Sequence, residues 1–161
     1  MLTIGMAAPN VKVPDGEGRL SLLKKVATKG PLVIFFYPKD FTPGCVKQAC
    51  MLRDLHGELA AQGIRVLGVS HQDEASHARF RAAHDLPFEL IADVDRRLIK
   101  AFEVEGPFGL VRRTTYLVDR EGRIADAVRA DFRIDRHEAF VRRAIAAAAE
   151  GRGADRPSSG R

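Results

Sequence analysis

Two cysteines, Cys45 and Cys50, are the residues of this 161-residue chain whose type and spacing are best suited to chemistry. They are the only cysteines and lie five positions apart, whereas a secreted disulfide scaffold would need more of them, spread along the sequence. A close pair is consistent with redox chemistry, with metal binding or with packing in the core. Because Cys-x4-Cys with no suitably placed histidine matches no common structural zinc spacing, redox chemistry and packing remain.

The sequence around Cys45 predicts that its thiol lies at a functional edge of the fold. Residues 32–36, LVIFF, predict a strand buried on both faces, and residues 46–62 carry apolar side chains at helical spacing. In open α/β sheets, sites lie beyond the carboxyl ends of strands and often at helix N-termini, where backbone N–H groups favour a thiolate. We therefore expect Cys45 to be a nucleophile, with the hydroxyl of Thr42 as a further donor to its thiolate.

Strand-like and helix-like segments alternate along the rest of the chain, which predicts an α/β fold with a central mixed sheet flanked by helices. Further strands are expected at residues 65–70, 114–118 and 123–129, the last two forming an antiparallel edge. Further helices are expected at residues 74–84, 96–102 and 135–149. We expect one domain over residues 1–150 and a disordered tail over residues 151–161, which are rich in Gly, Ser, Pro and Arg.

Composition and patterning argue against several classes of partner. The net charge is +5, but the basic residues are scattered, without a basic run or an RNA-binding motif, so we expect no nucleic-acid binding. No apolar run is long enough to cross a bilayer, and the N-terminus lacks the basic start of a secretory signal, so we expect no membrane association and a cytoplasmic location. The five histidines show no metal-binding spacing and are expected to lie on the surface.

The loop before Cys45 matches a known pattern. Pro38, Thr42 and Cys45 stand as P-x-x-x-T-x-x-C, which resembles the active-site loop of peroxiredoxins. The longer string YPKDFTPGC followed by KQAC resembles the bacterioferritin-comigratory-protein or Q-type subgroup. The resemblance covers about residues 3 to 145, and it implies a thioredoxin-like fold.

The resemblance also implies roles for the residues near Cys45. Cys45 would be the peroxidatic nucleophile, Pro38 would shield it, and Thr42 would hydrogen-bond both the thiolate and the peroxide. Arg113 would favour the thiolate and stabilise the charge that develops as the O–O bond breaks. Without the resemblance, the adjacent Arg112 would be an equal candidate for this role.

Three further residues follow from the same resemblance. Gln48 occupies a position where the family carries Glu or Gln and would orient Arg113, and Gly44 is grouped with it among the residues that bind or orient the substrate. Cys50 would be the resolving cysteine, although its apolar neighbours are also compatible with simple packing. Val46 replaces a threonine that is common in the subgroup, and we expect this less polar helix mouth to favour organic peroxides.

The resemblance implies a thiol-dependent peroxidase that needs no metal, haem or flavin. It would reduce hydrogen peroxide and organic hydroperoxides, form a disulfide between Cys45 and Cys50, and be re-reduced by thioredoxin or a glutaredoxin. Because this disulfide is intramolecular, we expect a monomer. One alternative is a general thiol–disulfide oxidoreductase, although that chemistry usually uses Cys-x-x-Cys. The other is a thioredoxin-fold holdase or interaction protein whose thiols are incidental.

The spacing of the two cysteines constrains how a disulfide between them could form. In one straight helix, five residues rise about 7.5 Å and turn about 500°, so the two Cα atoms would lie roughly 8.6 Å apart. A disulfide needs Cα atoms within about 7 Å of each other. We therefore expect the first turns of the helix to unwind on oxidation, and equal hydrogen-exchange protection of residues 43–52 in reduced and oxidised protein would contradict this.

Overall fold

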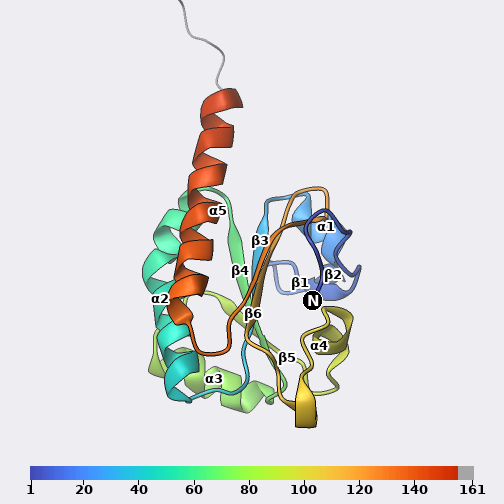
Figure 1. The fold of residues 1–161 in the computed structure, drawn as a ribbon, viewed down its shortest axis with the longest axis vertical. Coiled ribbons are helices and arrows are strands. Elements are labelled where there is room, and N and C mark those ends of the chain that lie inside the picture. Colours follow the sequence, from blue (N-terminus) through green and yellow to red (C-terminus); the bar gives the residue numbers. More distant parts are fainter. Residues whose placement is uncertain (156–161) are drawn as a thin grey trace, which may run out of the picture.

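A five-stranded mixed sheet forms the centre of the molecule in a computed structural model, which describes the backbone of residues 1–155 and the side chains of residues 1–151 (Figure 1). The strands are β3 (Leu32–Phe36), β4 (Arg65–Ser70), β5 (Glu89–Ala92), β6 (Thr114–Val118) and β7 (Ile124–Arg129). Their order is β5-β4-β3-β6-β7, with β3 parallel to β4 and antiparallel to β6. Phe36 at the end of β3 pairs with Thr114 at the start of β6, so the residue before Thr114 lies where the chain leaves β3.

Helices cover both faces of the sheet (Figure 1). One face carries α2 (Pro43–Ala61), α3 (Glu74–Ala83) and α5 (Ile134–Asp155). The other carries α1 (Leu23–Ala27), α4 (Arg97–Ala101) and the small antiparallel pair β1 (Lys12–Pro14) and β2 (Leu20–Leu22). A 3₁₀ turn, η1 (Pro107–Gly109), precedes β6, and none of the described helices is long and apolar enough to cross a membrane.

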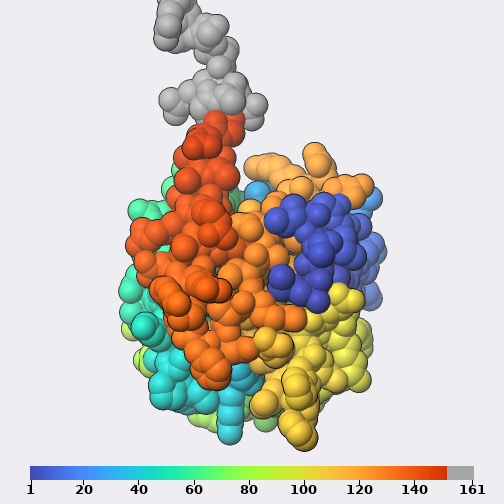
Figure 2. Space-filling view, viewed as in Figure 1, coloured from blue at the N-terminus to red at the C-terminus, as the bar shows by residue number. Residues whose placement is uncertain are grey.

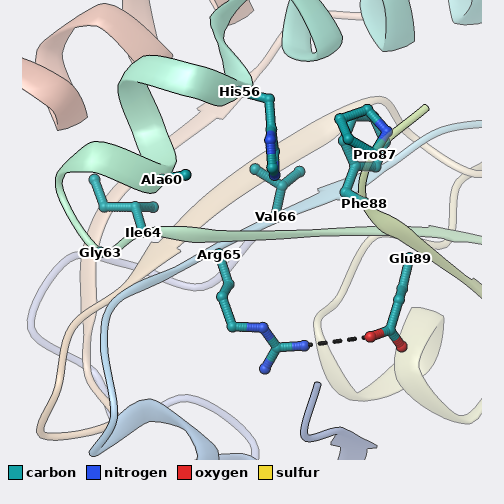
Figure 3. Close-up of a pocket in the computed structure, with 9 residues that line it drawn as sticks. All are labelled: His56, Ala60, Gly63, Ile64, Arg65, Val66, Pro87, Phe88 and Glu89. Carbon is teal, nitrogen blue, oxygen red and sulfur yellow. Dashed lines mark ion pairs between the residues drawn. The ribbon is translucent and has the colours of Figure 1, made fainter. Parts of the chain in front are cut away.

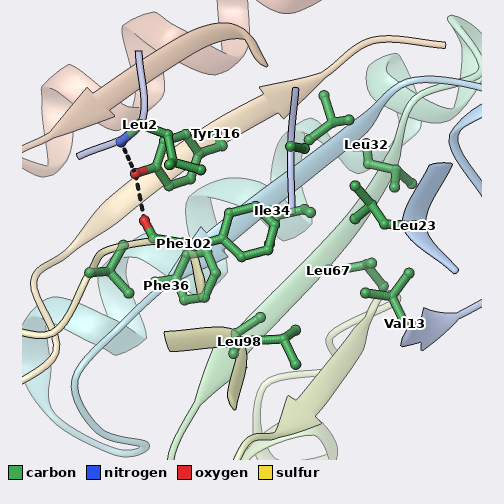
Figure 4. Packing of buried hydrophobic residues seen from close by; sticks show 14 of the residues in the cluster. Leu2, Val13, Leu23, Leu32, Ile34, Phe36, Leu67, Leu98, Phe102 and Tyr116 are labelled. Atoms are coloured by element: carbon green, nitrogen blue, oxygen red, sulfur yellow. Dashed lines mark hydrogen bonds between the residues drawn. The ribbon is translucent and has the colours of Figure 1, made fainter. Parts of the chain in front are cut away.

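The central strand β3 is buried along its whole length because its successive side chains enter two different cores. Leu32, Ile34 and Phe36 pack in the core beneath α1 and α4 (Figure 4). Val33 and Phe35 point the other way, into the core that α2, α3 and α5 cover. The continuous apolar run of β3 is thus the pattern of a strand with covered faces on both sides.

The two ends of the described chain differ in how they meet the body (Figure 2). The N-terminal segment lies against the start of β7, where Gly5 N donates to Ile124 O at 2.8 Å and Ile124 N donates to Met6 O at 2.8 Å. The C-terminal part of α5 projects beyond the sheet (Figures 1 and 2). We expected a disordered tail from residue 151; the backbone of α5 is described as far as Asp155, and residues 156–161 lie outside the described part. The alanine-rich sequence before Gly151 favours a helix and carries it past that glycine.

The four strands expected from the sequence are confirmed, and so are the four expected helices. The antiparallel edge formed by β6 and β7 is also confirmed. Helix α2 begins at Pro43, three residues earlier than expected, because proline fits the first position of a helix, where its missing N–H costs nothing. This earlier start places Cys45 inside the first turn of α2.

Candidate active site

Cys45 lies in the first turn of α2, which follows the loop of residues 37–42 after β3. Cys45 is 1% exposed, and its Sγ accepts a hydrogen bond from Nη2 of Arg113 at 3.3 Å. Arg113 directly precedes β6, and the pairing of β6 with β3 brings it to this point. The guanidinium is thus placed to donate to the sulfur of Cys45, and the thiolate is the nucleophilic form of a cysteine.

Several acceptors hold the Arg113 side chain in place. Nη1 donates to Oε1 of Gln48 at 2.7 Å, and Nε donates to the carbonyl O of Asp131 at 3.0 Å. Gln48 lies one turn after Cys45 on α2 and is fully buried. The guanidinium thus has a fixed orientation, with its remaining nitrogen directed at the Cys45 sulfur.

Asp131 distinguishes the two neighbouring arginines, and sequence reasoning missed it. Its Oδ1 accepts the backbone N–H of Arg113 at 3.0 Å, while its Oδ2 forms an ion pair with Nε of Arg112 at 2.9 Å. The Arg112 guanidinium therefore bonds to the carboxylate, and the Arg113 guanidinium bonds to the thiol. The register of the predicted β6–β7 hairpin was the available signal, because it places the residues after β7 beside those before β6.

Gly44 owes its identity to the approach of Arg113. A Cβ at residue 44 would lie 3.0 Å from Nη2 of Arg113, closer than ordinary van der Waals contact. The absence of a side chain on Gly44 leaves room for the guanidinium to reach Cys45 from that side. The position of Gly44 thus agrees with the orienting role expected for it.

Thr42 is the residue before α2, and its hydroxyl has another partner in this state. Its Oγ1 donates to the carbonyl O of Lys39 at 2.8 Å, within the loop itself. The expected hydrogen bond from Thr42 to the thiolate therefore stays a prediction, and forming it requires this hydroxyl to leave Lys39. Thr42 and Pro38 both line the pocket that leads to Cys45.

This pocket has a volume of about 430 Å³ and two chemically different walls. Pro38, Thr42, Gly44 and Arg113 form the wall next to Cys45. The rest of the lining is mainly apolar and includes Leu110, Val111, Phe132 and Ile134, with Arg112 and Asp131 as its charged members. Val46 is not among the lining residues; it packs against the core beneath α2, so the apolar character comes from other segments than the one we expected.

A second hollow, of about 270 Å³, lies near the end of α2, beside β4 and the start of β5 (Figure 3). Its charged side chains, Arg65 and Glu89, pair with each other at 3.6 Å. None of its lining residues is a cysteine, and His56 lies on its rim. The candidate chemistry therefore belongs to the pocket beside Cys45.

Cys50 lies on the same helix as Cys45, as the sequence predicted, and both are free thiols. Its side chain is partly buried, and its Sγ lies 4.0 Å from Nδ1 of His84. Because α2 is continuous from Pro43 through both cysteines, the geometric premise for unwinding holds. The unwinding itself stays a prediction.

Comparison with known proteins identifies the family. The model of the AhpC/TSA family matches residues 4–127, which is most of the chain. The chain belongs to the AhpC/TSA family.

The relatives of this chain within the AhpC/TSA family include peroxiredoxins named Q and Bcp. Peroxiredoxin Bcp of Bacillus subtilis is 36% identical over 130 residues, which cover 76% of this chain and 82% of that protein. The chloroplastic peroxiredoxin Q of Oryza sativa subsp. japonica is 38% identical over 135 residues, or 83% of this chain; this chain matches only 62% of the rice protein's length. The peroxiredoxins named Q or Bcp are thus relatives of this chain, and the assignment made from the loop motif is confirmed.

Solved structures confirm the thioredoxin-like peroxiredoxin fold. The peroxidoxin BcpB from Mycobacterium tuberculosis superposes with a TM-score of 0.80 at 28% identity, covering 98% of this chain and 100% of that one. The bacterioferritin comigratory protein of Xanthomonas campestris, studied for its alkyl peroxide reduction, gives a TM-score of 0.78 at 30% identity, covering 91% and 99%. Peroxiredoxins are enzymes that reduce peroxides with a cysteine thiol.

Two histidines of this AhpC/TSA family member are buried, contrary to the surface position we expected. Nδ1 of His77 lies 2.7 Å from Oδ2 of Asp40, and its Nε2 lies 3.1 Å from the carbonyl O of Ile91. His137 contacts Thr115 Oγ1 at 2.8 Å, and burial lowers its pKa. Both rings complete the hydrogen bonding of buried polar groups, which a periodicity pattern does not reveal.

Asp40 lies in the loop between β3 and α2 and is the centre of a buried polar network. Its carboxylate accepts hydrogen bonds from Tyr37 Oη at 2.6 Å and Ser76 Oγ at 2.8 Å, besides its contact with His77. Burial alone would raise the pKa of Asp40, but the bonds from His77, Tyr37 and Ser76 outweigh it and hold that pKa below its usual range. The backbone N–H of Asp40 also donates to Gln72, so the active-site loop is anchored to α3 and the segment before it.

Within residues 1–151, no group of three or more His, Cys, Asp or Glu side chains is placed to hold a metal ion.

Proposed function

We propose that this chain is a thiol peroxidase in which Cys45 attacks the peroxide and Cys50 resolves the product. The observation that supports this most directly is the 3.3 Å hydrogen bond from the buried Arg113 to the Cys45 sulfur, beside an open pocket. The Cys45 thiolate attacks one peroxide oxygen, so an S–O bond forms while the O–O bond breaks. The other oxygen leaves as an alcohol or as water after it takes up a proton. Arg113 stabilises the charge on the oxygens as this bond breaks.

The second step returns the sulfenic acid to a disulfide. The Cys50 sulfur attacks the Cys45 sulfur, the S–O bond breaks, and the oxygen leaves as water. Both cysteines lie on one helix, so this step needs the first turns of α2 to open. The two thiol hydrogens and one peroxide oxygen leave as water, which balances the reaction.

The pocket walls favour organic hydroperoxides along with hydrogen peroxide. Arg113 and the loop would hold the peroxide group, while the apolar wall of Leu110, Phe132 and Ile134 would take an alkyl chain. The Xanthomonas relative, studied for alkyl peroxide reduction, supports this substrate class. Rate constants for hydrogen peroxide and cumene hydroperoxide would measure the preference.

The disulfide must be reduced by an external dithiol. We assign this role to thioredoxin, with a glutaredoxin as the other candidate, and place the monomeric enzyme in the cytoplasm, where such reductants operate. A coupled assay with thioredoxin, its reductase and NADPH, run beside a glutaredoxin system, would identify the reductant. Light scattering of the reduced and oxidised protein would test the monomer.

Peroxide consumption by the reduced protein is the first test, with a thiol count and intact mass before and after. We expect one equivalent of peroxide to be consumed and two thiols to be lost. Cys45→Ser should be inactive, and Cys50→Ser should stop at a sulfenic or more oxidised Cys45. Untouched peroxide with both thiols still free in the wild type would disprove the proposed function.

A further inference from the structure

The resolving thiol has a histidine beside it that the reaction described above does not use. His84 caps the C-terminal end of α3, and its Nδ1 lies 4.0 Å from the Sγ of Cys50. Both side chains are partly buried, so each of them keeps some contact with solvent. A separation of 4.0 Å is the outer limit of a hydrogen bond to sulfur, so a small approach of the two side chains brings the thiol proton to the ring nitrogen.

Contacts with three segments hold His84 in place: Arg53 on α2, Phe80 on α3 and Phe41 in the loop before α2. Nη1 of Arg53 donates to the carbonyl O of His84 at 2.9 Å. The His84 ring packs edge-on against Phe80, with centroids 5.2 Å apart, and its centroid lies 6.4 Å from that of Phe41. The imidazole therefore occupies a defined position beside Cys50.

The position of Arg53 matters for the opening of the helix. Arg53 follows Cys50 by three residues, on the side of Cys50 away from Cys45. If the turns that contain Cys45 open and those after Cys50 stay wound, the bond from Arg53 continues to hold His84 beside the resolving cysteine. The contact between His84 and Cys50 can thus persist while the first turns of α2 open for disulfide formation.

Resolution requires a thiolate at Cys50. An ordinary thiol is only a few per cent ionised near pH 7, while an ordinary imidazole, with a pKa near 6.5, is mostly neutral and able to accept a proton there. Arg53 interacts electrostatically with Cys50, and its own charge is also balanced by Asp54 and Asp85. An imidazole next to the thiol therefore supplies what the second step lacks, which is a proton acceptor.

We propose that His84 is the general base of the resolving step, an inference that rests on the proposed peroxidase function. With its own proton on Nε2, His84 takes the Cys50 thiol proton at Nδ1. The Cys50 thiolate then forms the S–S bond with Cys45, and the S–O bond of the sulfenic acid breaks. The departing hydroxide takes up the proton held by the imidazolium and leaves as water, so His84 returns to its neutral form.

A rapid-quench experiment that separates the two steps tests this. Reduced protein is mixed with one equivalent of peroxide; sulfenic acid is trapped with dimedone, and the disulfide is followed by intact mass. We expect His84→Asn to form the sulfenic acid at the wild-type rate and to form the disulfide about 10- to 30-fold more slowly near pH 7. This range reflects the few per cent of a free thiol that is already ionised there.

Two readouts distinguish a base from a structural residue. The deficit of His84→Asn should shrink toward zero near pH 9.5, where an ordinary thiol is mostly ionised without a base. Added imidazole should restore the resolving rate of His84→Gly, in which the ring is missing. A misplaced helix would respond to neither treatment.

His56→Asn is the matched control, because His56 lies on α2 away from Cys50 and has the same side chain. It should resolve at the wild-type rate. A wild-type resolving rate in His84→Asn, or a deficit that neither alkaline pH nor imidazole repairs, would overturn the role of His84 while leaving the peroxidase intact. Failure of wild type to form any sulfenic acid would overturn both proposals, so the two failures are distinguishable.

Discussion

Cys45 and Cys50 share one helix, but their thiols lie in different surroundings. Cys45 is buried against the guanidinium of Arg113, a group that stays charged and does not take up a proton at physiological pH. Cys50 is partly exposed and lies against the imidazole of His84, a side chain of the type that can both accept and donate a proton. The first site is suited to keep a thiolate ready at all times, and the second is suited to generate one when it is needed.

This difference matches the order of the proposed reaction. A thiolate at Cys45 must exist before the peroxide arrives, so a fixed cation serves it well. A permanent thiolate at Cys50 would be open to oxidation by peroxide itself, because susceptibility follows thiolate character and exposure. A protonated thiol with a base nearby avoids that reaction until Cys45 has become a sulfenic acid.

Among the changes considered, removing the Arg113 guanidinium is expected to separate the rates of the Cys45 step and the Cys50 step most strongly. Arg113→Met should slow sulfenic acid formation about 100- to 1000-fold, because it removes the donor that stabilises both the thiolate and the breaking O–O bond. Once the sulfenic acid has formed, its resolution by Cys50 should proceed near the wild-type rate. Rapid-quench rates for the two steps would check this.

Arg112→Met is the matched control for Arg113→Met. Arg112 pairs with Asp131, so its loss removes a neighbour of the site and not the donor to the sulfur. We expect a loss of only a few-fold in the first step. Equal losses in the two variants would mean that the positive charge of the region matters more than the contact with Cys45.

Replacing Asp40 should affect stability, and it tests whether the two cysteine sites are independent. Asp40→Asn leaves the buried His77 without its charged partner, which should lower the free energy of unfolding by roughly 3 kcal/mol. Since His77 and Ser76 both lie on α3, the helix that ends at His84, disulfide formation should slow more than sulfenic acid formation. Urea unfolding and the two rapid-quench rates would measure these effects.

The pH dependence gives the Asp40 prediction a second readout. The pKa of Asp40 in the folded protein lies below its usual value, so its contribution is complete above about pH 4 and is lost as the pH falls further. Wild type should therefore lose stability below about pH 4 more steeply than Asp40→Asn does. Parallel curves would show that Asp40 contributes no net stabilisation as a carboxylate.

The sequence predicted the fold where patterns were long and local. The apolar run of β3 and the helical spacing of α2 predicted both elements, and the motif from Pro38 to Cys45 predicted a nucleophile at Cys45. The strands β1 and β2 were missed because they have only three residues each. Strand β5 was missed because it has only four residues, and each of those four is partly buried. Such short segments form because the sheet or its neighbours hold them, which composition does not reveal.

The partners of the site residues were the harder part to predict. Asp131 meets Arg113 across 18 positions, Cys50 meets His84 across 34, and Asp40 meets His77 across 37. These pairs depend on how α3 and β7 pack, and in the sequence Asp131, His84, Asp40 and His77 each resemble an ordinary surface residue. The resemblance predicted the candidate reacting residues and Gln48 as a partner of Arg113, whereas only the structure gives Asp131, His84 and the Asp40 network.

The smallest expected effect comes from Gly44, whose missing side chain makes room for Arg113. In Gly44→Ala the new Cβ would lie 3.0 Å from Nη2, so the guanidinium must shift by a few tenths of an ångström away from the Cys45 sulfur. We expect sulfenic acid formation to slow several-fold and resolution at Cys50 to stay unchanged, because the partner of Cys50 is His84, at the C-terminal end of α3. Alanine is the better helix former, so thermal stability should not fall with the rate.

Gly57→Ala, on the same helix with open space around its Cβ, is the control and should leave both rates unchanged. An equal slowing of both steps in Gly44→Ala would mean that the first turn of α2 couples the two thiols, and the separation drawn between them would fail.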